Sequence, residues 1–360
     1  MKVLKFGGTS VGSAQRMKEV AKLITDGEQK IVVLSAMSGT TNTLVEISDY
    51  LYKKNPEGAN EIINRLEAKY KQHVNELYST DEYKQKTQEF IKAQFDYIRS
   101  YTKDIFTLFE EKVILAQGEL ISTNMVTNYL QEQGVNAILL PALEFMRTDK
   151  NSEPDPVYIK EKLAAQLEIH PDAEIYITQG FICRNAYGEI DNLQRGGSDY
   201  TASLVGAAIH ASEIQIWTDI DGMHDNDPRI VDKTSPVRHL HFEEAAELAY
   251  FGAKILHPTC VQPAKYANIP VRLLNTMEPT APGTLISNDT EKGKIKAVAA
   301  KDNITAIKIK SSRMLLAHGF LRKVFEIFES YQTSIDMICT SEVGVSVSID
   351  NTKHLNEILD

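Results

Sequence analysis

Two turns built on adjacent glycines carry the residue types that bind small anions. The first is Lys5-Phe6-Gly7-Gly8-Thr9, with a cation at the end of a predicted strand, and the second is Arg195-Gly196-Gly197-Ser198-Asp199. Adjacent glycines let a backbone approach a ligand closely, and the N-terminus of a following helix attracts negative charge. The fork of Arg195 suits a carboxylate, and Asp199 could hold an ammonium group or orient a lysine. We therefore predict an anion site, with plain structural turns and an N-cap at Ser198 as the alternative.

Further segments hold polar or charged residues next to predicted strands or helices. Hydroxyls and amides cluster in Leu34–Asn42, where turn and N-cap chemistry would explain them almost as well as ligand binding. Glu119 is either a site carboxylate or a first-turn residue that answers a helix dipole. The acidic loop after Trp217 is either a solvated turn or a nucleotide contact. Lys254 is either a site cation or an ordinary lysine near the end of an apolar helix.

Composition and missing motifs argue against several classes of function. The 360-residue chain has a net charge of −10, which would repel a nucleic acid. No apolar run reaches the ~18 residues of a membrane span. Three well-separated cysteines, Cys183, Cys260 and Cys339, form neither a disulfide framework nor a metal-ligand spacing and suit a reducing cytoplasm. Ser13 follows Gly12 where a Walker loop has lysine, and the glycine fingerprint of a dinucleotide dehydrogenase is missing.

Short apolar runs alternate with helical patterns along most of the chain. The runs show little two-residue alternation, which is typical of strands buried on both faces of a parallel sheet. This order predicts an α/β fold with a mainly parallel central sheet covered by helices. The expected strands are Val3–Phe6, Ile31–Ser35, Ala137–Leu140, Glu174–Thr178, Ile214–Thr218 and Val271–Leu274, and the expected helices include Ala14–Thr25, Ser198–Ala211 and Glu243–Leu256.

Two regions depart from this alternation. Residues 59–117 contain neither Gly nor Pro, so we expect a helical insertion over about 55–117 that turns near Ser79–Asp81 and covers the sheet or shapes a substrate rim. Turn-forming residues crowd into Asn275–Lys294, and we expect domains at 1–290 and 291–360. The second is a βαββ unit, expected as Thr305–Ile309, Phe320–Tyr331, Ser334–Thr340 and Val343–Ile349, with another helix beginning at His354.

Seven motifs follow one another along the chain. They are KFGGTS at Lys5–Ser10, LSAMSGTTN at Leu34–Asn42, GE at Gly118–Glu119, RGGSD at Arg195–Asp199, WTDIDG at Trp217–Gly222, DPR at Asp227–Arg229 and GAKILHP at Gly252–Pro258. In this order they resemble the motifs of the aspartate kinases, members of the amino acid kinase family, and the resemblance covers essentially the whole chain. It implies a three-layer αβα sandwich with a mainly parallel sheet, followed by a small α+β unit like an incomplete ACT regulatory domain.

The resemblance also implies an activity and its residues. Aspartate kinases transfer a phosphoryl group from ATP to the side-chain carboxylate of L-aspartate, giving 4-phospho-L-aspartate on the route to lysine, threonine and methionine. Mg²⁺ is expected on the ATP phosphates, with no ligands from protein side chains. The implied catalytic residues are Lys5, Asp199 and Lys254; the implied ATP contacts are Lys5, Gly7, Gly8, Thr218, Asp219, His224, Arg229, Lys254 and Ile255; the implied aspartate contacts are Ser35, Thr41, Glu119, Arg195, Gly196, Gly197, Ser198 and Asp199.

This reaction agrees with what the sequence lacks. The attacking carboxylate is already ionised at pH 7, since its reference pKa is about 3.9, so no general base is needed. The chemistry requires instead that two anions be held together and that the charge on the transferring phosphoryl group be neutralised. The absence of a Ser-His-Asp or Cys-His constellation is therefore expected.

The tail and one loop residue bear on regulation and on the nucleotide. His224 stands where many aspartate kinases have tyrosine, and Leu316 and Ala317 stand where lysine-sensitive members often have polar residues. The tail otherwise matches those members, so we expect inhibition by lysine, with threonine or no effector as alternatives, and a homodimer or higher homo-oligomer formed through the tail. The implied effector contacts are Met314, Gly319, Phe320, Leu321, Ser334, Ile335, Asp336, Ser341 and Glu342.

Two other readings of the whole chain are kept as alternatives. One is a different amino acid kinase, acting on glutamate, acetylglutamate, carbamate or UMP, against which Arg195–Asp199 and the tail argue. The other is an amino-acid sensor with a dead kinase site, against which the intact Lys5, Arg195, Asp199 and Lys254 argue.

Overall fold

The computed structural model describes residues 1–360 apart from 104, 194–195, 252–255, 290–294 and 311–317. Its contacts divide the chain into two units, Met1–Ala299 and Ala300–Asp360. Each unit buries apolar side chains of its own, and the first unit has two such cores. The division falls a little beyond the expected boundary at residue 290.

An eight-stranded sheet forms the middle layer of the first unit. Its order is β3-β4-β2-β1-β7-β9-β10-β8, and every pairing is parallel except that of β9 with β10. The predicted mainly parallel sheet is confirmed, although β8 and β10 were not predicted because they are too short to show a pattern. The strands are β1 (Lys2–Phe6), β2 (Lys30–Leu34), β3 (Ala137–Leu140), β4 (Ile175–Gln179), β7 (Ile214–Thr218), β8 (His239–His241), β9 (Val271–Asn275) and β10 (Thr284–Ser287).

Both faces of this sheet are buried, which explains the uninterrupted apolar runs. Leu4 and Phe6 of β1 belong to one core, whereas Val3 belongs to the other. In β2, Val32 joins the first core and Val33 the second. Because side chains alternate between the faces of a strand, each central strand supplies two separate cores, and each core needs its own layer of helices.

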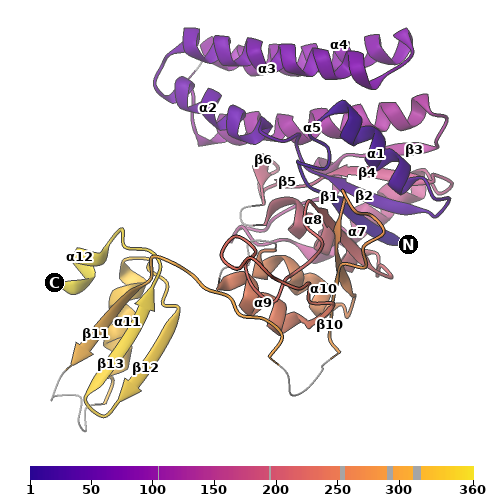
Figure 1. Ribbon diagram of the computed structural model, residues 1–360. Helices are drawn as coiled ribbons and strands as arrows, with labels where there is room; N and C mark the ends of the chain where they lie inside the picture. The colour runs from indigo at the N-terminus through magenta and orange to yellow at the C-terminus, as the bar shows by residue number, and fades with distance from the viewer. Residues whose placement is uncertain (104, 194–195, 252–255, 290–294, 311–317) are drawn as a thin grey trace. The chain divides into compact units, whose positions relative to one another are not determined.

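On one face lie α1 (Ala14–Ile24), α2 (Thr40–Tyr52) and α5 (Leu108–Glu132), and a hairpin of two long helices is stacked over them (Figure 1). The hairpin consists of α3 (Pro56–Leu77) and α4 (Asp81–Ser100), followed by the short 3₁₀ helix Tyr101–Lys103. Both helices and the turn between them lie within the segment 55–117, where a helical insertion was predicted. Glu132 of α5 holds this turn, since its carboxylate accepts hydrogen bonds from the backbone N–H groups of Ser79 and Thr80 at 3.0 and 2.7 Å.

The prediction was wrong about where the next helix begins. Residues 118–119 were expected to open it, but α5 begins at Leu108 after a capping box formed by Thr107 and Glu110. Glu119 therefore lies in the middle of α5 and is buried, so it cannot be a first-turn residue that answers a helix dipole. The helix Glu243–Leu256 was also predicted too long, because α9 (Phe242–Tyr250) ends at its C-cap residue Phe251.

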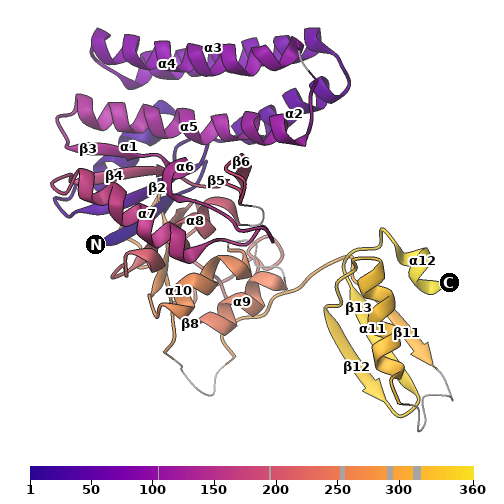
Figure 2. The same cartoon turned by 180° about the vertical axis from the view of Figure 1, so that it is seen from behind.

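The helices of the opposite face complete the three-layer αβα sandwich (Figure 2). Among them, α8 packs directly on β1, β2 and β7. The predicted three-layer architecture is confirmed. The remaining elements of this unit are α6 (Ala142–Phe145), α7 (Pro156–Ile169), α8 (Gly197–Ala208), α9, α10 (Gln262–Tyr266), the 3₁₀ helix Pro258–Val261, and a two-stranded ribbon of β5 (Ile182–Arg184) and β6 (Ile190–Asn192).

The second unit has the predicted βαββ order. Its three strands form an antiparallel sheet in the order β11-β13-β12, so β12 lies at an edge. Helix α11 packs Val324 and Phe328 into a small core with Val345 and Val347 of β13. The elements are β11 (Thr305–Lys310), α11 (Phe320–Ser330), β12 (Met337–Ser341), β13 (Gly344–Ile349) and a terminal turn of helix, α12 (Leu355–Leu359).

Within the part of the chain that the structure describes, no helix combines the length and apolar character needed to cross a membrane.

Candidate active site

The carboxyl ends of the parallel strands meet along one edge of the central sheet. The first strand, β1, lies between β2 and β7. From the end of β1 the chain crosses to β2, whereas from the end of β7 it continues to the opposite side of the sheet, so the direction of the crossovers reverses between β1 and β7. Ligands of open parallel α/β sheets bind in the crevice that such a reversal creates. Here the chain leaves β1 as Gly7-Gly8-Thr9 and leaves β2 as Ser35-Ala36. The sequence-predicted turns therefore lie at the edge where a ligand site is expected.

Lys5 and Asp199 form an ion pair at this edge. The Lys5 Nζ atom of β1 lies 2.7 Å from Oδ1 of Asp199, and the two side chains are only 10% and 15% exposed. Asp199 stands in the first turn of α8, which packs against β1. Removing either partner would leave a charge largely buried and uncompensated. The structure thus brings together two of the three residues implied to be catalytic.

The turn before Asp199 requires glycine for two reasons. Gly196, the N-cap of α8, has φ of +85°, in the left-handed region that favours glycine. A Cβ atom at this position would lie only 1.8 Å from Sγ of Cys260, which is itself buried. The backbone at Gly196 therefore lies close to the Cys260 side chain, which by itself requires glycine at this position.

Two serines join the turn after β2 to the start of α8. The hydroxyl of Ser35 donates to Oγ of Ser198 at 2.9 Å. The carbonyl of Ser35 accepts from the hydroxyl of Ser122 on α5 at 2.8 Å. Ser35 and Ser198, both predicted to contact the substrate, are thus linked to each other and to the helix that carries Glu119.

Glu119 points into this cluster from the middle of α5. Its Oε1 atom accepts a hydrogen bond of 3.1 Å from the backbone N–H of Ala36, and its Oε2 atom is buried with no hydrogen-bond partner among the described residues. Burial raises the pKa of this carboxyl group to about 8, and the hydrogen bond from Ala36 only partly offsets that effect. A buried carboxyl with one free oxygen is suited to accept a donor, such as an ammonium group, from a bound molecule.

The first glycine turn presents backbone donors beside Lys5. The N–H of Gly7 donates to the carbonyl of Trp217 at 3.3 Å, whereas those of Gly8 and Thr9 have no acceptor among the described residues. A Cβ atom at Gly8 would lie 2.9 Å from the carbonyl oxygen of Ala36. These unpaired N–H groups next to a lysine can receive the oxygens of an anion.

The predicted nucleotide residues after β7 occupy a separate loop. The imidazole of His224 bridges Asp221 and Thr234, with Nε2 and Nδ1 at 2.6 and 2.7 Å from their oxygens. Arg229 is largely exposed and its Nε bonds to Asp227 two residues away at 2.9 Å. In the described structure no hydrogen bond or ion pair connects this loop to Lys5 or Glu119. Thr218 closes β7 and accepts from the N–H of Ile220 at 3.2 Å, and Asp219 is exposed.

Several predicted residues are not covered by the structure or are spread apart within it. Lys254, Ile255, Arg195 and Met314 lie outside the described residues, and Thr41 is half-buried in the first turn of α2. In the second unit, Gly319 caps α11, which Phe320 and Leu321 begin. Ser334, Ile335 and Asp336 precede β12, Ser341 ends it and Glu342 follows it. The described effector residues are therefore divided between the start of α11 and the two ends of β12.

The sequence analysis did not identify the buried polar residues whose hydrogen bonds hold the elements of this site together. Gln179, at the end of β4, donates to Thr123 of α5 at 2.8 Å and accepts from the N–H of Ala142 at the same distance. Tyr70 of α3 is hydrogen-bonded to Thr40 at 2.8 Å, and both are buried. No local pattern in the sequence indicates these partners.

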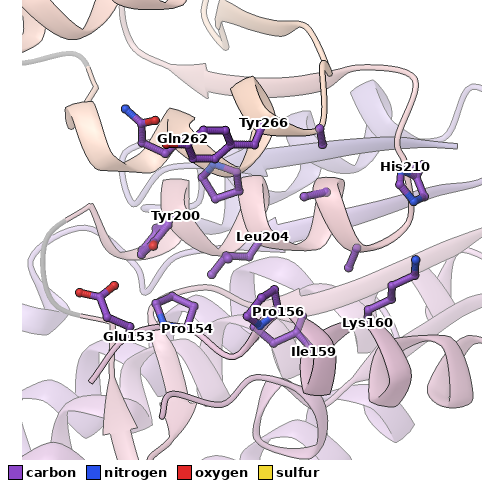
Figure 3. A pocket seen from close by; sticks show the side chains of 14 residues that line it. Glu153, Pro154, Pro156, Ile159, Lys160, Tyr200, Leu204, His210, Gln262 and Tyr266 are labelled. Carbon is purple, nitrogen blue, oxygen red and sulfur yellow. The ribbon is translucent and has the colours of Figure 1, made fainter. Parts of the chain in front are cut away.

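A cavity of about 510 Å³ lies away from this cluster, on the outer side of α8 (Figure 3). Leu204 and Tyr200 of α8 line it together with Ile159 of α7 and Tyr266 of α10. None of its lining residues is a predicted site residue. Elsewhere too, the described residues include no cluster of three or more His, Cys, Asp or Glu side chains that could hold a metal ion.

Residues 1–275 match the model of the amino acid kinase family. Aspartokinase 1, chloroplastic, of Arabidopsis thaliana is 37% identical over 98% of this chain and 63% of its own length. The chain thus spans less than two thirds of that relative. Lysine-sensitive aspartokinase 3 of Escherichia coli (strain K12) is 36% identical over 97% of this chain and 78% of its own.

Solved structures of aspartokinases have the same fold as this chain. Aspartokinase III of E. coli in complex with aspartate and ADP superimposes with a TM-score of 0.84 at 34% identity, covering 98% of this chain and 79% of that one. The aspartate kinase of Clostridium acetobutylicum also gives 0.84, at 26% identity, covering 100% of this chain and 81% of that one. The chain belongs to the amino acid kinase family, on the branch formed by the aspartokinases.

Proposed function

We propose that this chain transfers the γ-phosphoryl group of ATP to the side-chain carboxylate of L-aspartate, giving 4-phospho-L-aspartate. The observation that carries the proposal is the continuous set of contacts from Lys5 through Asp199, Ser198 and Ser35 to the buried Glu119. A lysine and a buried carboxyl lie in one cluster there, which supports binding of a phosphoryl group beside an ammonium group. The aspartokinase relatives, one of them solved with aspartate and ADP, support the same reaction.

The proposed chemistry needs electrostatic stabilisation more than proton transfer. Lys5 would neutralise charge on the transferring phosphoryl group while Asp199 holds its ammonium in place. The free N–H groups of Gly8 and Thr9 would bind the same oxygens. Lys254 is proposed as a second cation. Mg²⁺ would be held by the phosphates of ATP.

The amino acid would be held from the side of α5 and α8. Glu119 would accept the α-ammonium group on its free Oε2 atom, and Arg195 would grip the α-carboxylate. Ser35, Thr41, Gly196, Gly197 and Ser198 are proposed as further contacts. Thr218, Asp219, His224, Arg229 and Ile255 are proposed to hold the nucleotide together with Gly7.

A coupled assay that follows ADP release tests the reaction. We expect turnover with aspartate and little with glutamate, acetylglutamate, carbamate or UMP. Hydroxylamine trapping of the acyl phosphate would identify the product as a carboxyl phosphate. Turnover with glutamate but not with aspartate would reassign the substrate, and no turnover with any of these acceptors would favour the sensor.

We propose that the second unit pairs with a copy of itself along β12 and binds an amino-acid effector there. All five residues of this edge strand are exposed, including the apolar Met337 and Ile338, and an exposed edge is a template for pairing. Antiparallel pairing would bring Ser334–Asp336 of one copy beside Ser341 and Glu342 of the other. Lysine is the proposed effector, with threonine as the alternative.

Light scattering tests this pairing. We expect a dimer or larger assembly that dissociates in Met337→Glu, whereas Leu359→Glu, an exposed apolar residue of the same unit outside the edge, should leave it intact. Titration of the kinase reaction with lysine and with threonine tests the effector; a flat response to lysine would exclude it.

The buried free thiols Cys183 and Cys260 support the proposal of a reducing cytoplasm as the compartment.

A further inference from the structure

The helical hairpin α3–α4 is not assigned a role by the reaction, and most of its packing is apolar. Ile62, Ile63, Leu66 and Val74 of α3 join the core between the helices and the sheet. Burial of these side chains alone would explain why the hairpin is present. Tyr70 breaks the pattern, because it carries a hydroxyl into the same core.

The Tyr70 hydroxyl has one partner there. The side chain is 1% exposed, and its hydroxyl lies 2.8 Å from Oγ1 of Thr40. Phenylalanine would fill the same volume, and a buried hydroxyl without a partner is unfavourable, so the hydrogen bond is the feature that distinguishes tyrosine at this position. The contact therefore joins helix α3 of the hairpin to the first residue of α2.

Thr40 is the first residue of α2, at the end of the turn that leaves β2. A Cβ atom added at Gly118 of α5 would lie 3.3 Å from the methyl group of Thr40 and 2.8 Å from the Cβ atom of Ala36. Both side chains therefore pack closely against α5 at Gly118. Ala36 in turn donates its N–H to Glu119. Thr40, Ala36 and Glu119 are thus packed as one unit, with Tyr70 behind it.

An electrostatic effect agrees with this proximity. Burial raises the pKa of the Tyr70 phenol, the hydrogen bond with Thr40 lowers it, and the charge of Glu119 raises it again. The phenol is therefore within electrostatic reach of the carboxyl that is proposed to receive the substrate's ammonium group.

We infer that Tyr70 is a positioning residue, through which the hairpin holds the turn Ser35–Thr40 and Glu119 in register for the amino acid substrate. This inference rests on the proposed function. Tyr70 touches no proposed substrate atom and acts through Thr40. It should therefore matter for binding of the amino acid and not for ATP or for the chemical step.

Kinetics of Tyr70→Phe test the inference. We expect KM for aspartate to rise roughly five- to tenfold, the effect of one lost hydrogen bond, with KM for ATP and kcat within about twofold of wild type. Tyr78→Phe is the matched control: Tyr78, at the end of α3, is also buried and donates to the Met125 carbonyl at 2.7 Å, away from the Thr40–Glu119 unit. It should lose comparable stability without a change in KM for aspartate.

A double-mutant cycle with Thr40→Val adds a second, independent measurement. Because one hydrogen bond joins the two hydroxyls, the double variant should be no worse than the more impaired single variant. Three results would each overturn the inference. They are strictly additive effects of Tyr70→Phe and Thr40→Val on KM for aspartate, an unchanged KM in Tyr70→Phe, and equal changes of KM in Tyr70→Phe and Tyr78→Phe.

The wild-type assay separates this result from the proposed function. If wild type phosphorylates a different amino acid, the proposed substrate fails, and the same variants are compared on the acceptor that it does use. If wild type binds an amino acid without turnover, the variants are compared by calorimetric affinity for that amino acid. Absence of binding and turnover with every acceptor would overturn both.

Discussion

The Nζ atom of Lys5 lies 2.7 Å from Oδ1 of Asp199, and this ion pair joins the central strand of the sheet to the first turn of α8. Each side chain is largely buried, so each depends on the other for charge compensation. The pair also orients the ammonium group toward the glycine turn that follows β1. A phosphoryl group bound there would meet a lysine already held in place, which is the arrangement that lowers the cost of reorganisation during the reaction.

Replacement of Lys5 should therefore impair turnover strongly. We expect Lys5→Ala to lower kcat by at least ~10²-fold, the scale for removing one preorganised charge contact. Lys2→Ala is the matched control, since Lys2 begins the same strand but pairs with Glu28 at 2.9 Å on the surface. Steady-state kinetics of both variants provide the measurement. A near-normal kcat in Lys5→Ala would remove Lys5 from the mechanism.

Binding of aspartate should release a proton below pH 8. Burial raises the pKa of Glu119 to about 8, so the free protein holds this carboxyl protonated at pH 7, and an incoming ammonium group favours the ionised form. Calorimetric titrations at pH 7 in buffers of different ionisation enthalpy count the protons released. Glu119→Gln should abolish the release. A binding enthalpy that is independent of buffer in wild type would contradict this prediction.

The same carboxyl should make stability depend on pH. Its folded-state pKa, about 8, is higher than its ordinary value of 4.5, so the folded chain retains a proton that the unfolded chain loses across this interval. The free energy of unfolding should therefore fall as pH rises from about 4.5 to 8. Denaturant titrations of wild type and Glu119→Gln should show a shallower fall in the variant. Parallel curves would argue against a raised pKa.

At Gly196 a side chain should lower activity more through its clash with Cys260 than through the strain of the left-handed backbone conformation. Gly196 and Gly188 have nearly the same φ, +85° and +83°, but only Gly196 has a neighbour, Cys260, within reach of an added Cβ atom. Gly196→Ala should reduce kcat/KM for aspartate at least ~10-fold because the start of α8 must shift. Gly188→Ala carries the same backbone strain without the clash and should retain activity. Equal losses in the two variants would leave backbone strain as the whole explanation.

Two of the three thiols should be unreactive in the folded protein. Burial raises the pKa values of Cys183 and Cys260 to about 12, so neither supplies a thiolate near neutral pH, whereas Cys339 is exposed. A chromogenic disulfide reagent at pH 8 should label Cys339 alone before denaturation and all three cysteines after it. Labelling of Cys260 in the native protein would show that the turn before α8 opens.

The sheet could be predicted well because its signals are local. Val3–Phe6 and Ile214–Thr218 are mainly apolar with little alternation, and each became a largely buried strand of the central sheet. The glycine turns were found for the same reason, since the residues of each turn are adjacent in sequence. Lys5 and Asp199, however, are 194 positions apart, and only the resemblance to a family placed them in one site.

Glu119 shows what local reasoning could not find. Next to Gly118 it resembled the first residue of a helix, but the capping box at Thr107 starts α5 more than two turns earlier. Its partner Ala36 lies 83 residues away, and Tyr70 reaches the same unit from the hairpin. These contacts depend on how helices stack over the sheet, and no spacing within one segment encodes that stacking.

The two apolar cores of the first unit share the central sheet and also one helix, since α5 places Ile114 in one core and Ala116 in the other. Leu4 and Val3 are neighbours in sequence, yet they belong to different cores. Repacking of strand residues on one face should then combine with repacking of strand residues on the other by simple addition of free energies, whereas changes along α5 should couple the two cores. For directed evolution this means that the strand positions of each face can be randomised in separate libraries, while the positions of α5 have to be varied together with both.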